Sequence, residues 1–366
     1  MKSLVKPTRL NPGDKVATVS LSAGTAGDPP SLWRYHQGKR RIEELLGLSV
    51  VEMPHTLAGS AYNSLHPEAR AADLMAAFAD PSIKAIVSCI GGIDTVRLLP
   101  YIDFDIIRDN PKVFMGYSDT TVNHYMCYKA GLSSIYGPAV LSDFAENVAM
   151  PSYTLNFVKR TLFSAEPIGQ VPPAPNWCSD RLEWVISNKD TTRQFRANTG
   201  YELIQGTGVA RGRLIGGCLE AFIDLEAFIG LSATELFPPA SDFAGTILFF
   251  ETSGMQPPAR EGYPVEIGGK PGRVKSYLEM LRSLGELGIL AQANGMVIGK
   301  PVGEKYFTEY QIVIKQVLAE YGRSDLPVLY NLSFGHCEPK FCLPYGAMAE
   351  IDCANKTFSI LESAVH

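Results

Sequence analysis

VFMGYSD, at residues 113–119, is the stretch that most directly indicates the fold. Residues 113–115 are apolar, which is typical of a buried strand, and Thr121, Tyr125 and Tyr128 then follow at helical spacing. A short polar turn that contains Ser118 separates the two patterns. A strand that leads directly into a helix is the unit of a parallel sheet covered by helices, so the stretch predicts an α/β fold.

The same alternation extends to both sides of this stretch. Towards the N-terminus, we expect strands at residues 15–20 and 85–90 and helices at 31–46 and 67–78. Towards the C-terminus, we expect a helix at 218–229, a closing hairpin at 347–361, and strands at 210–214, 246–250, 296–298 and 328–332.

A chain of 366 residues is long for one domain and predicts two. Residues 166–199 interrupt the alternation with four prolines, two tryptophans and a polar run. Long segments of this kind are often functional, so we interpret this one as a linker and substrate loop. The predicted boundaries are 1–165 for the N-terminal domain, 166–199 for the linker and 200–366 for the C-terminal domain.

The composition is that of a folded enzyme, with 46% hydrophobic and 19% charged residues. The net charge is −5 and the basic residues form no stripe, which argues against DNA or RNA polymers as partners. The N-terminus has no apolar signal sequence, and no run of about 18 apolar residues occurs. We therefore expect a cytoplasmic protein that does not cross a membrane.

The seven cysteines are odd in number and show no C-x-x-C spacing, which argues against a disulfide framework and a zinc ribbon. We expect most of them to be buried and reduced. Cys337 directly follows His336, so a thiol nucleophile there is one alternative for the chemistry. The sequence otherwise predicts neither a metal nor a cofactor.

Ser118 is the candidate nucleophile. It lies between a strand and a helix, as the nucleophile of a strand-turn-helix elbow does, although Thr120 stands where the motif G-x-S-x-G has glycine. Amides at the helix N-terminus would favour the negative charge that develops in acyl transfer. The alternative is a serine that only caps the helix.

A nucleophilic serine needs a base and a group that orients the base. His336 is the candidate base, because it follows an apolar strand and Gly335 at a position that borders the cleft in α/β proteins. Glu251 is the candidate orienting carboxylate, because it ends the apolar run 246–250. Each has a structural alternative, a histidine with satisfied hydrogen bonds or a capped strand end, but their order, Ser, Glu, His, is that of other hydrolases.

Gly91 and Gly92 end the strand that precedes the Ser118 strand, so their backbone can approach the same site without a Cβ atom in the way. With the amide of Asp119, the amide of Gly92 would supply two donors for an oxyanion. Gly91 is expected to border the bound substrate. A pair of glycines is also a common turn, and this one lacks the G-x-G-x-x-G spacing of a dinucleotide site.

Together these motifs resemble the LD-carboxypeptidase family of serine peptidases. The resemblance rests on IGG at 90–92, RLLPYID at 97–103, GYSD at 116–119, GRLIGG at 212–217, LFFE at 248–251 and GH at 335–336, in the family's order. It implies that Ser118 is the nucleophile, His336 the general base and Glu251 its orienting residue. It also implies an oxyanion hole formed by the amides of Gly92 and Asp119.

The resemblance further implies a flavodoxin-like N-terminal parallel-sheet domain and a smaller, β-rich C-terminal α/β domain. The triad would form at their junction, usually in a homodimer, and would need no cofactor. Two substrate classes occur in the family. One branch removes the terminal D-alanine of muropeptide tetrapeptides, and the MccF-like branch, which acts in microcin C self-immunity, cleaves the amide of peptidyl- or aminoacyl-nucleotides.

The length of this chain and its insertion at 166–199 are similar to the MccF-like branch, where loop aromatics stack on the nucleobase. Trp184 is the first candidate for this contact and Trp177 the second, and the alternative is that both anchor the loop. This chain differs from the MccF-like branch at two positions that contact the acyl group there. Cys218 stands where the family commonly has asparagine, and the segment from Thr252 to Met255 lacks the lysine that follows the triad glutamate in that branch. These departures bear on the specificity for aspartyl-nucleotides and leave hydrolysis as the expectation. A separate alternative is an inactive peptide-binding module, against which the intact Ser118, Glu251 and His336 argue.

Overall fold

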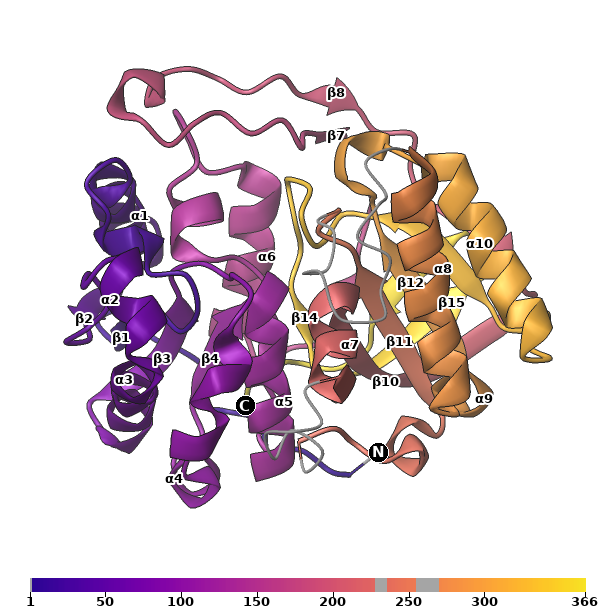
Figure 1. Ribbon diagram of the computed structural model, residues 1–366, viewed down its shortest axis with the longest axis horizontal. Coiled ribbons are helices and arrows are strands. Elements are labelled where there is room, and N and C mark those ends of the chain that lie inside the picture. Colours follow the sequence, from indigo (N-terminus) through magenta and orange to yellow (C-terminus); the bar gives the residue numbers. More distant parts are fainter. Residues whose placement is uncertain (1, 228–235, 255–269) are drawn as a thin grey trace.

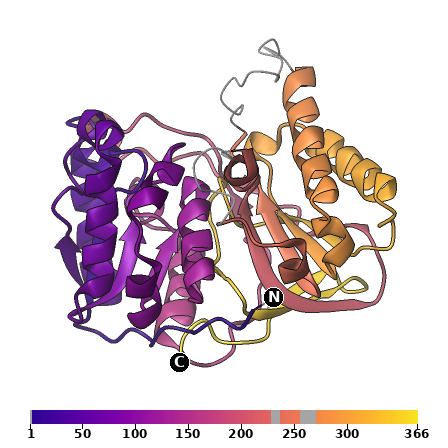
Figure 2. The ribbon, with the colours of Figure 1, turned by 60° about the horizontal axis from the view of Figure 1, so that its bottom comes forward.

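The computed structural model describes residues 2–227, 236–254 and 270–366. These residues form two sheets with helices packed on them (Figure 1), and the two halves of the chain lie side by side in both ribbon views (Figure 2). The chain is an α/β protein, as the sequence predicts. No helix among these residues is both long and apolar enough to cross a membrane.

The first sheet is built mainly by the N-terminal half, and its five N-terminal strands are parallel. Their spatial order, β2-β1-β3-β4-β5, is the flavodoxin-like order, which confirms the predicted type. The strands are β1 (Lys15–Val19), β2 (Ser49–Glu52), β3 (Ile83–Ser88), β4 (Val113–Gly116) and β5 (Ile135–Tyr136). The main helices that connect them are α1 (Leu32–Leu46), α2 (Ser60–Leu65), α3 (Pro67–Ala79), α4 (Phe104–Asp109) and α5 (Thr121–Ala130).

The second sheet has eight strands in the order β6-β16-β15-β10-β11-β12-β13-β9. Its centre is parallel: β10 (Val209–Cys218), β11 (Thr246–Glu251), β12 (Gly295–Gly299) and β13 (Val328–Leu332). Its edges are antiparallel: β6 (Gly169–Gln170), β9 (Glu202–Gln205), β15 (Met348–Asp352) and β16 (Thr357–Ile360). The pairing of β15 with β16 confirms the predicted closing hairpin.

Helices of the second half include α7 (Leu219–Ala227), α8 (Lys270–Glu286), α9 (Ile289–Gln292) and α10 (Phe307–Glu320). The second sheet has more strands than the first, because four antiparallel strands at its edges extend the parallel centre. Sheet membership also crosses the predicted boundaries. The late strand β14 (Leu343–Pro344) joins the first sheet beside β5, and β6, from the predicted linker, joins the second.

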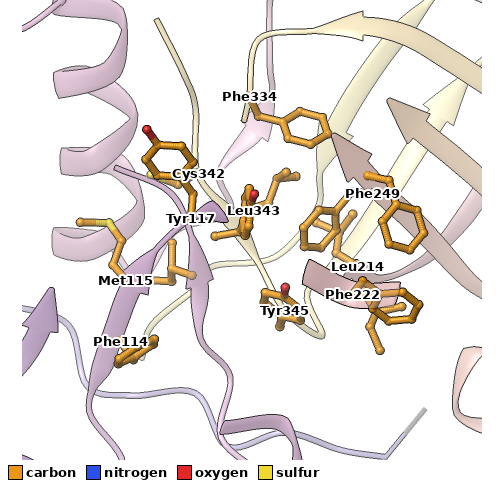
Figure 3. Close-up of a cluster of buried hydrophobic side chains, with 14 of the residues drawn as sticks. Phe114, Met115, Tyr117, Leu214, Phe222, Phe249, Phe334, Cys342, Leu343 and Tyr345 are labelled. Atoms are coloured by element: carbon orange, nitrogen blue, oxygen red, sulfur yellow. The ribbon is translucent and has the colours of Figure 1, made fainter. Parts of the chain in front are cut away.

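The two sheets share one hydrophobic core. Figure 3 shows Phe114 and Met115 from the first sheet and Phe249 from the second, with Tyr345 between the two strands that carry them. The rings of Phe249 and Tyr345 are 5.1 Å apart. The hydroxyls of Tyr125 and Tyr345 both donate to the carbonyl of Gly216, so polar as well as apolar contacts fix one half against the other.

Residues 166–199 leave the first half after α6 (Ser152–Phe163) and run across the top of the molecule in Figure 1. Within this segment, β7 (Asn176–Trp177) and β8 (Arg196–Ala197) pair as a short ribbon. The part between the ribbon strands reaches α1, where the Trp33 indole donates to the carbonyl of Trp184. This segment thus spans from one half to the other.

Candidate active site

Ser118 lies at the end of β4 in a strained turn, with a positive φ of 64°. Gly116 makes the turn possible, because a Cβ atom there would lie 2.7 Å from the Thr120 side chain and 2.9 Å from that of Ser88. The helix α5 begins at Thr121 with Thr120 at its N-cap. Ser118 is therefore not the N-cap residue of α5. Its hydroxyl instead contacts the ring of His336.

The Ser118 hydroxyl lies 3.0 Å from Nε2 of His336, and Nδ1 of His336 lies 2.7 Å from Oε2 of Glu251. An ionised carboxylate can only accept, so Nδ1 carries the proton and Nε2 is left to accept from the serine. The structure thus brings the three residues together in the order that a serine hydrolase needs. They come from the turn after β4, the end of β11 and the loop after β13, and Glu251 and His336 are buried.

Glu251 accepts three hydrogen bonds, from the backbone amide and ring of His336 and from the hydroxyl of Tyr136, which is 2.6 Å away. Burial alone would raise the pKa of this carboxyl, but His336 and the hydrogen bonds of both neighbours outweigh burial and lower the pKa. Gly335 permits this close packing, because a Cβ atom there would lie 2.4 Å from the Glu251 side chain.

Tyr136 is a residue that the sequence analysis missed. Its oxygen accepts from the backbone amide of Ser118 at 3.1 Å, so its proton is directed to Glu251. One buried phenol therefore links the carboxylate to the turn that holds the serine. A signal was present, since Tyr136 ends the strand next to β4, but the two-residue length of β5 hides it. We call Ser118, Tyr136, Glu251 and His336 the catalytic centre.

Gly91 lies against the Ser118 side chain: a Cβ atom on Gly91 would lie 2.9 Å from Oγ of Ser118 and 3.1 Å from the amide nitrogen of Asp119. Gly92 is equally crowded, with the Ser22 hydroxyl 2.2 Å from its ideal Cβ position. Both positions therefore require glycine, as a close backbone approach predicts.

The Asp119 carboxylate points away from this contact and accepts from the Ser22 hydroxyl and from the amide and hydroxyl of Thr95. Burial raises the pKa of Asp119, and the hydrogen bonds from Ser22 and Thr95 offset part of that rise. These bonds hold the backbone around Gly92 and the Ser118 turn in one rigid arrangement.

Ser118 and His336 open into a pocket of about 640 Å³. Gly91, Gly92 and Tyr117 line the pocket near the serine, and residues 181–185 of the linker segment form another part of its wall. Trp184 lies in that part, with the Arg34 guanidinium over its ring at 5.0 Å. The first candidate for the stacking contact therefore borders the same pocket as the serine.

Buried charges join the linker segment to this pocket. Arg193 pairs with Glu146 and, at 3.1 Å, with Glu338. Glu338 in turn contacts Lys340, whose ammonium lies 4.1 Å from the centre of the Tyr117 ring. We call Arg34, Glu146, Trp184, Arg193 and Glu338 the pocket wall. The sequence analysis found only Trp184 among them, because ion pairs between distant segments leave no local pattern.

Burial would raise the pKa of Glu338, but Lys340 and Arg193 lower it below its ordinary value. Burial likewise opposes the charge of Lys340, yet Asp143, Tyr117 and Glu338 raise its pKa. Both groups are thus held in their charged forms beside the pocket.

Two other predicted residues do not line the pocket. Trp177 is 3% exposed and packs beneath the Lys300 ammonium, 4.4 Å from the ring centre, so it serves as an anchor of the ribbon. Cys218 is buried, and its thiol donates to Glu220. Met255 lies outside the described residues.

The alternative of a thiol nucleophile at Cys337 is not supported by the geometry. Its sulfur contacts the carbonyls of Lys300 and Pro301, and burial raises the pKa of the thiol well above its ordinary value.

Known proteins share this architecture. Residues 16–137 match the LD-carboxypeptidase N-terminal domain and residues 211–351 the LD-carboxypeptidase C-terminal domain. The chain is 34% identical to an MccF-like protein from Streptococcus pneumoniae solved in complex with AMP, with a TM-score of 0.83 over 95% of this chain and 98% of the other.

Two curated relatives point to different substrates. The chain is 28% identical to the microcin C7 self-immunity protein MccF of Escherichia coli, over 96% of this chain and 94% of that protein. It is 26% identical to a probable murein peptide carboxypeptidase of Bacillus subtilis, over 98% of this chain and 97% of that protein. The chain belongs to the LD-carboxypeptidase family of serine peptidases.

Proposed function

We propose that this protein is a serine amidohydrolase whose nucleophile is Ser118. The carrying observation is the hydrogen-bonded chain Ser118, His336, Glu251 at the base of a pocket. His336 takes the serine proton through Nε2, the serine oxygen attacks an amide carbonyl, and the imidazolium then returns the proton to the leaving amine. Water hydrolyses the resulting acyl-enzyme by the reverse sequence.

In this mechanism, the amides of Gly92 and Asp119 stabilise the oxyanion. Two observations support the assignment. The Gly91 backbone lies in contact with the Ser118 side chain, and the Asp119 amide follows the nucleophile in a turn of positive φ. The hydrogen bonds that the Asp119 side chain accepts from Ser22 and Thr95 support a preorganised oxyanion hole, in which little reorganisation would oppose the reaction.

We further propose an aminoacyl- or peptidyl-nucleotide substrate, with Trp184 as the stacking surface for the base. Support comes from the position of Trp184 in the wall of the pocket that holds Ser118, and from the AMP bound by the Streptococcus pneumoniae relative. Arg34 covers one face of the indole and so holds the ring in place. The amide between the acyl group and the nucleotide would then lie at Ser118.

The second candidate is removal of a terminal D-alanine from a muropeptide tetrapeptide. It is favoured by the relative named as a murein peptide carboxypeptidase and by Cys218, which replaces an asparagine expected to bind the acyl group of a nucleotide substrate. A direct test compares kcat/KM for an aminoacyl-sulfamoyl adenosine and a muropeptide tetrapeptide. A clear preference for the muropeptide would reverse the order of the two candidates, and hydrolysis of neither would contradict both.

We also propose that the protein acts in the cytoplasm and, as the family resemblance implies, as a homodimer. Sedimentation equilibrium of the full chain at micromolar concentration measures the assembly directly. A mass equal to the 39.9 kDa of one chain would contradict the dimer.

A further inference from the structure

Cys218 lies beside the two residues that control the nucleophile. It ends β10 and is the register partner of Glu251, which ends the neighbouring parallel strand β11. Partners in adjacent parallel strands direct their side chains to the same face of the sheet. The Cys218 sulfur, a carboxylate oxygen of Glu251 and a ring nitrogen of His336 all lie within 4.8 Å of one another.

This group has the donor set of a zinc site. Zinc binds thiolate sulfur at about 2.3 Å and imidazole nitrogen and carboxylate oxygen at about 2.0–2.2 Å, in tetrahedral geometry. Such a geometry needs ligand atoms roughly 3–4 Å apart, so shifts of about 1 Å would close the three atoms around one ion. Cys218 ends β10, Glu251 ends β11 and His336 lies in the loop after β13, and Cys218 and Glu251 are each only 2% exposed.

The surroundings also suit a cation. The Glu220 carboxylate accepts from the Cys218 thiol at 3.2 Å and from the hydroxyls of Thr252 and Ser253, so it places a second negative charge, besides that of Glu251, where it would attract a cation. His336 and Ser253 line the substrate pocket, which gives an ion a route to the group.

We propose that Cys218, Glu251 and His336 form an inhibitory site for a thiophilic divalent cation such as Zn²⁺. Binding forms a metal–sulfur bond, breaks the S–H bond and releases its proton to water. If the imidazole binds the metal through Nδ1, the N–H bond to Glu251 breaks and the proton passes by way of water to Nε2, which can then no longer accept from Ser118; if it binds through Nε2, the lone pair that accepts from Ser118 is used directly and the Nδ1 proton stays in place. In either case, the base is removed from the nucleophile and hydrolysis stops.

The test measures binding and activity separately, because the inhibitory part of the proposal rests on the proposed function and the binding part does not. Zn²⁺ is titrated against a chromophoric chelator with tag-free full-length protein, and Co²⁺ serves as a spectroscopic probe for a thiolate-to-metal band. We expect one ion per chain, a thiolate band, and a fall in turnover of at least tenfold at saturating Zn²⁺ that excess chelator reverses.

Cys218→Asn and Cys218→Ser should each weaken binding at least about tenfold, a loss that even outer-shell changes around a metal commonly cause. Inhibition is expressed relative to the metal-free rate of each variant, and thermal unfolding verifies that each variant is folded. Cys337→Ala is the matched control, because it removes another buried thiol next to His336 whose sulfur faces the carbonyls of Lys300 and Pro301. It should bind Zn²⁺ as the wild type does.

Equal affinity in wild type and Cys218→Asn, an equal loss in Cys337→Ala, or no thiolate band would overturn the site. Ser118→Ala, which cannot turn over by the proposed mechanism, should still bind the ion. Zinc bound by a wild type that hydrolyses neither substrate would contradict the proposed function alone. Hydrolysis that is insensitive to Zn²⁺ would contradict the inhibitory site alone.

Discussion

The catalytic centre and the pocket wall are built in different ways. Ser118, Tyr136 and Glu251 lie at the ends of strands in both sheets, and short hydrogen bonds connect them through the shared core. The pocket wall instead depends on residues 166–199, which are held by the ion pairs of Arg193 and by the contact of Trp184 with α1.

The fold thus separates the residues of the proposed chemistry from those of the proposed recognition. The ends of strands are fixed by hydrogen-bond ladders to the neighbouring strands, so they can hold the positions of reacting groups to within a few tenths of an ångström. In a segment that is held by only a few polar contacts, residues can be substituted without disturbing those ladders. Changes in the catalytic centre should therefore reduce kcat for every substrate, whereas changes in the pocket wall should act on KM for particular substrates.

The largest effect is expected from Ser118→Ala. Without the nucleophile, kcat/KM should fall about 10⁴- to 10⁶-fold for both candidate substrates. The measurement is steady-state hydrolysis, accompanied by intact mass after treatment with a serine-reactive phosphonate. The wild type should gain one adduct and the variant none. An adduct on the variant, or unchanged turnover, would place the nucleophile elsewhere.

Gly91→Ala should be the next most damaging change. The new methyl group would lie 2.7 Å from Cβ and 2.9 Å from Oγ of Ser118, so the serine must shift. A displacement of about 1 Å at a reacting group costs about 10²-fold in rate. We expect kcat to fall by that factor with KM little changed, measured on the same two substrates. A normal kcat would show that the Gly91 backbone does not approach the serine as described.

Tyr136→Phe should cost about 10- to 100-fold in kcat, because a buried hydrogen bond to a charged group contributes about 1.5–3 kcal/mol. The phenylalanine keeps the ring but leaves the Ser118 amide and Oε1 of Glu251 without this partner. The control is Tyr153→Phe, which removes a hydroxyl that donates to the carbonyl of Pro172, away from the catalytic centre. Equal losses in both variants would mean that Tyr136 acts only through stability.

Trp184→Ala should affect substrate binding at the pocket wall and leave the catalytic centre unchanged. Loss of a stacking contact costs about 1–3 kcal/mol, or about 5- to 150-fold in KM for an aminoacyl-sulfamoyl adenosine. kcat at saturation and the kinetics with a muropeptide should change little. Equal effects on both substrates would show that Trp184 supports the pocket without contacting the base.

Glu338→Gln should produce the smallest effect, visible in the pH dependence of stability. Because the pKa of Glu338 is lowered in the folded protein, its contribution is present above its ordinary pKa of 4.5 and is lost as the pH falls below that value. The variant should be less stable at pH 7 and should lose less stability between about pH 5 and 3. Urea unfolding at several pH values measures this, with the exposed Glu183→Gln as control. Identical slopes for all three proteins would contradict the assigned pKa shift.

The local parts of the fold were predictable because they depend on nearby residues. The strand, turn and helix around Ser118 follow from the apolar run 113–115 and the spacing after it, and the hairpin at 347–361 follows from alternation. The two-residue strand β5 was missed, since so short a run carries no periodicity. The position of Trp177 in a predicted loop favours a surface contact, whereas the structure buries its side chain within the otherwise exposed ribbon of β7 and β8.

From the amino-acid sequence alone, Ser118, Glu251 and His336 are recognisable as polar residues that follow strands in this order, because strand ends and glycine turns are encoded locally. Only the tertiary structure decided that Glu251 and His336 meet Ser118, that Tyr136 bridges them and that Cys218 lies beside them. The physical reason is that strand order and sheet packing bring together residues up to 218 positions apart, and such contacts depend on the whole core.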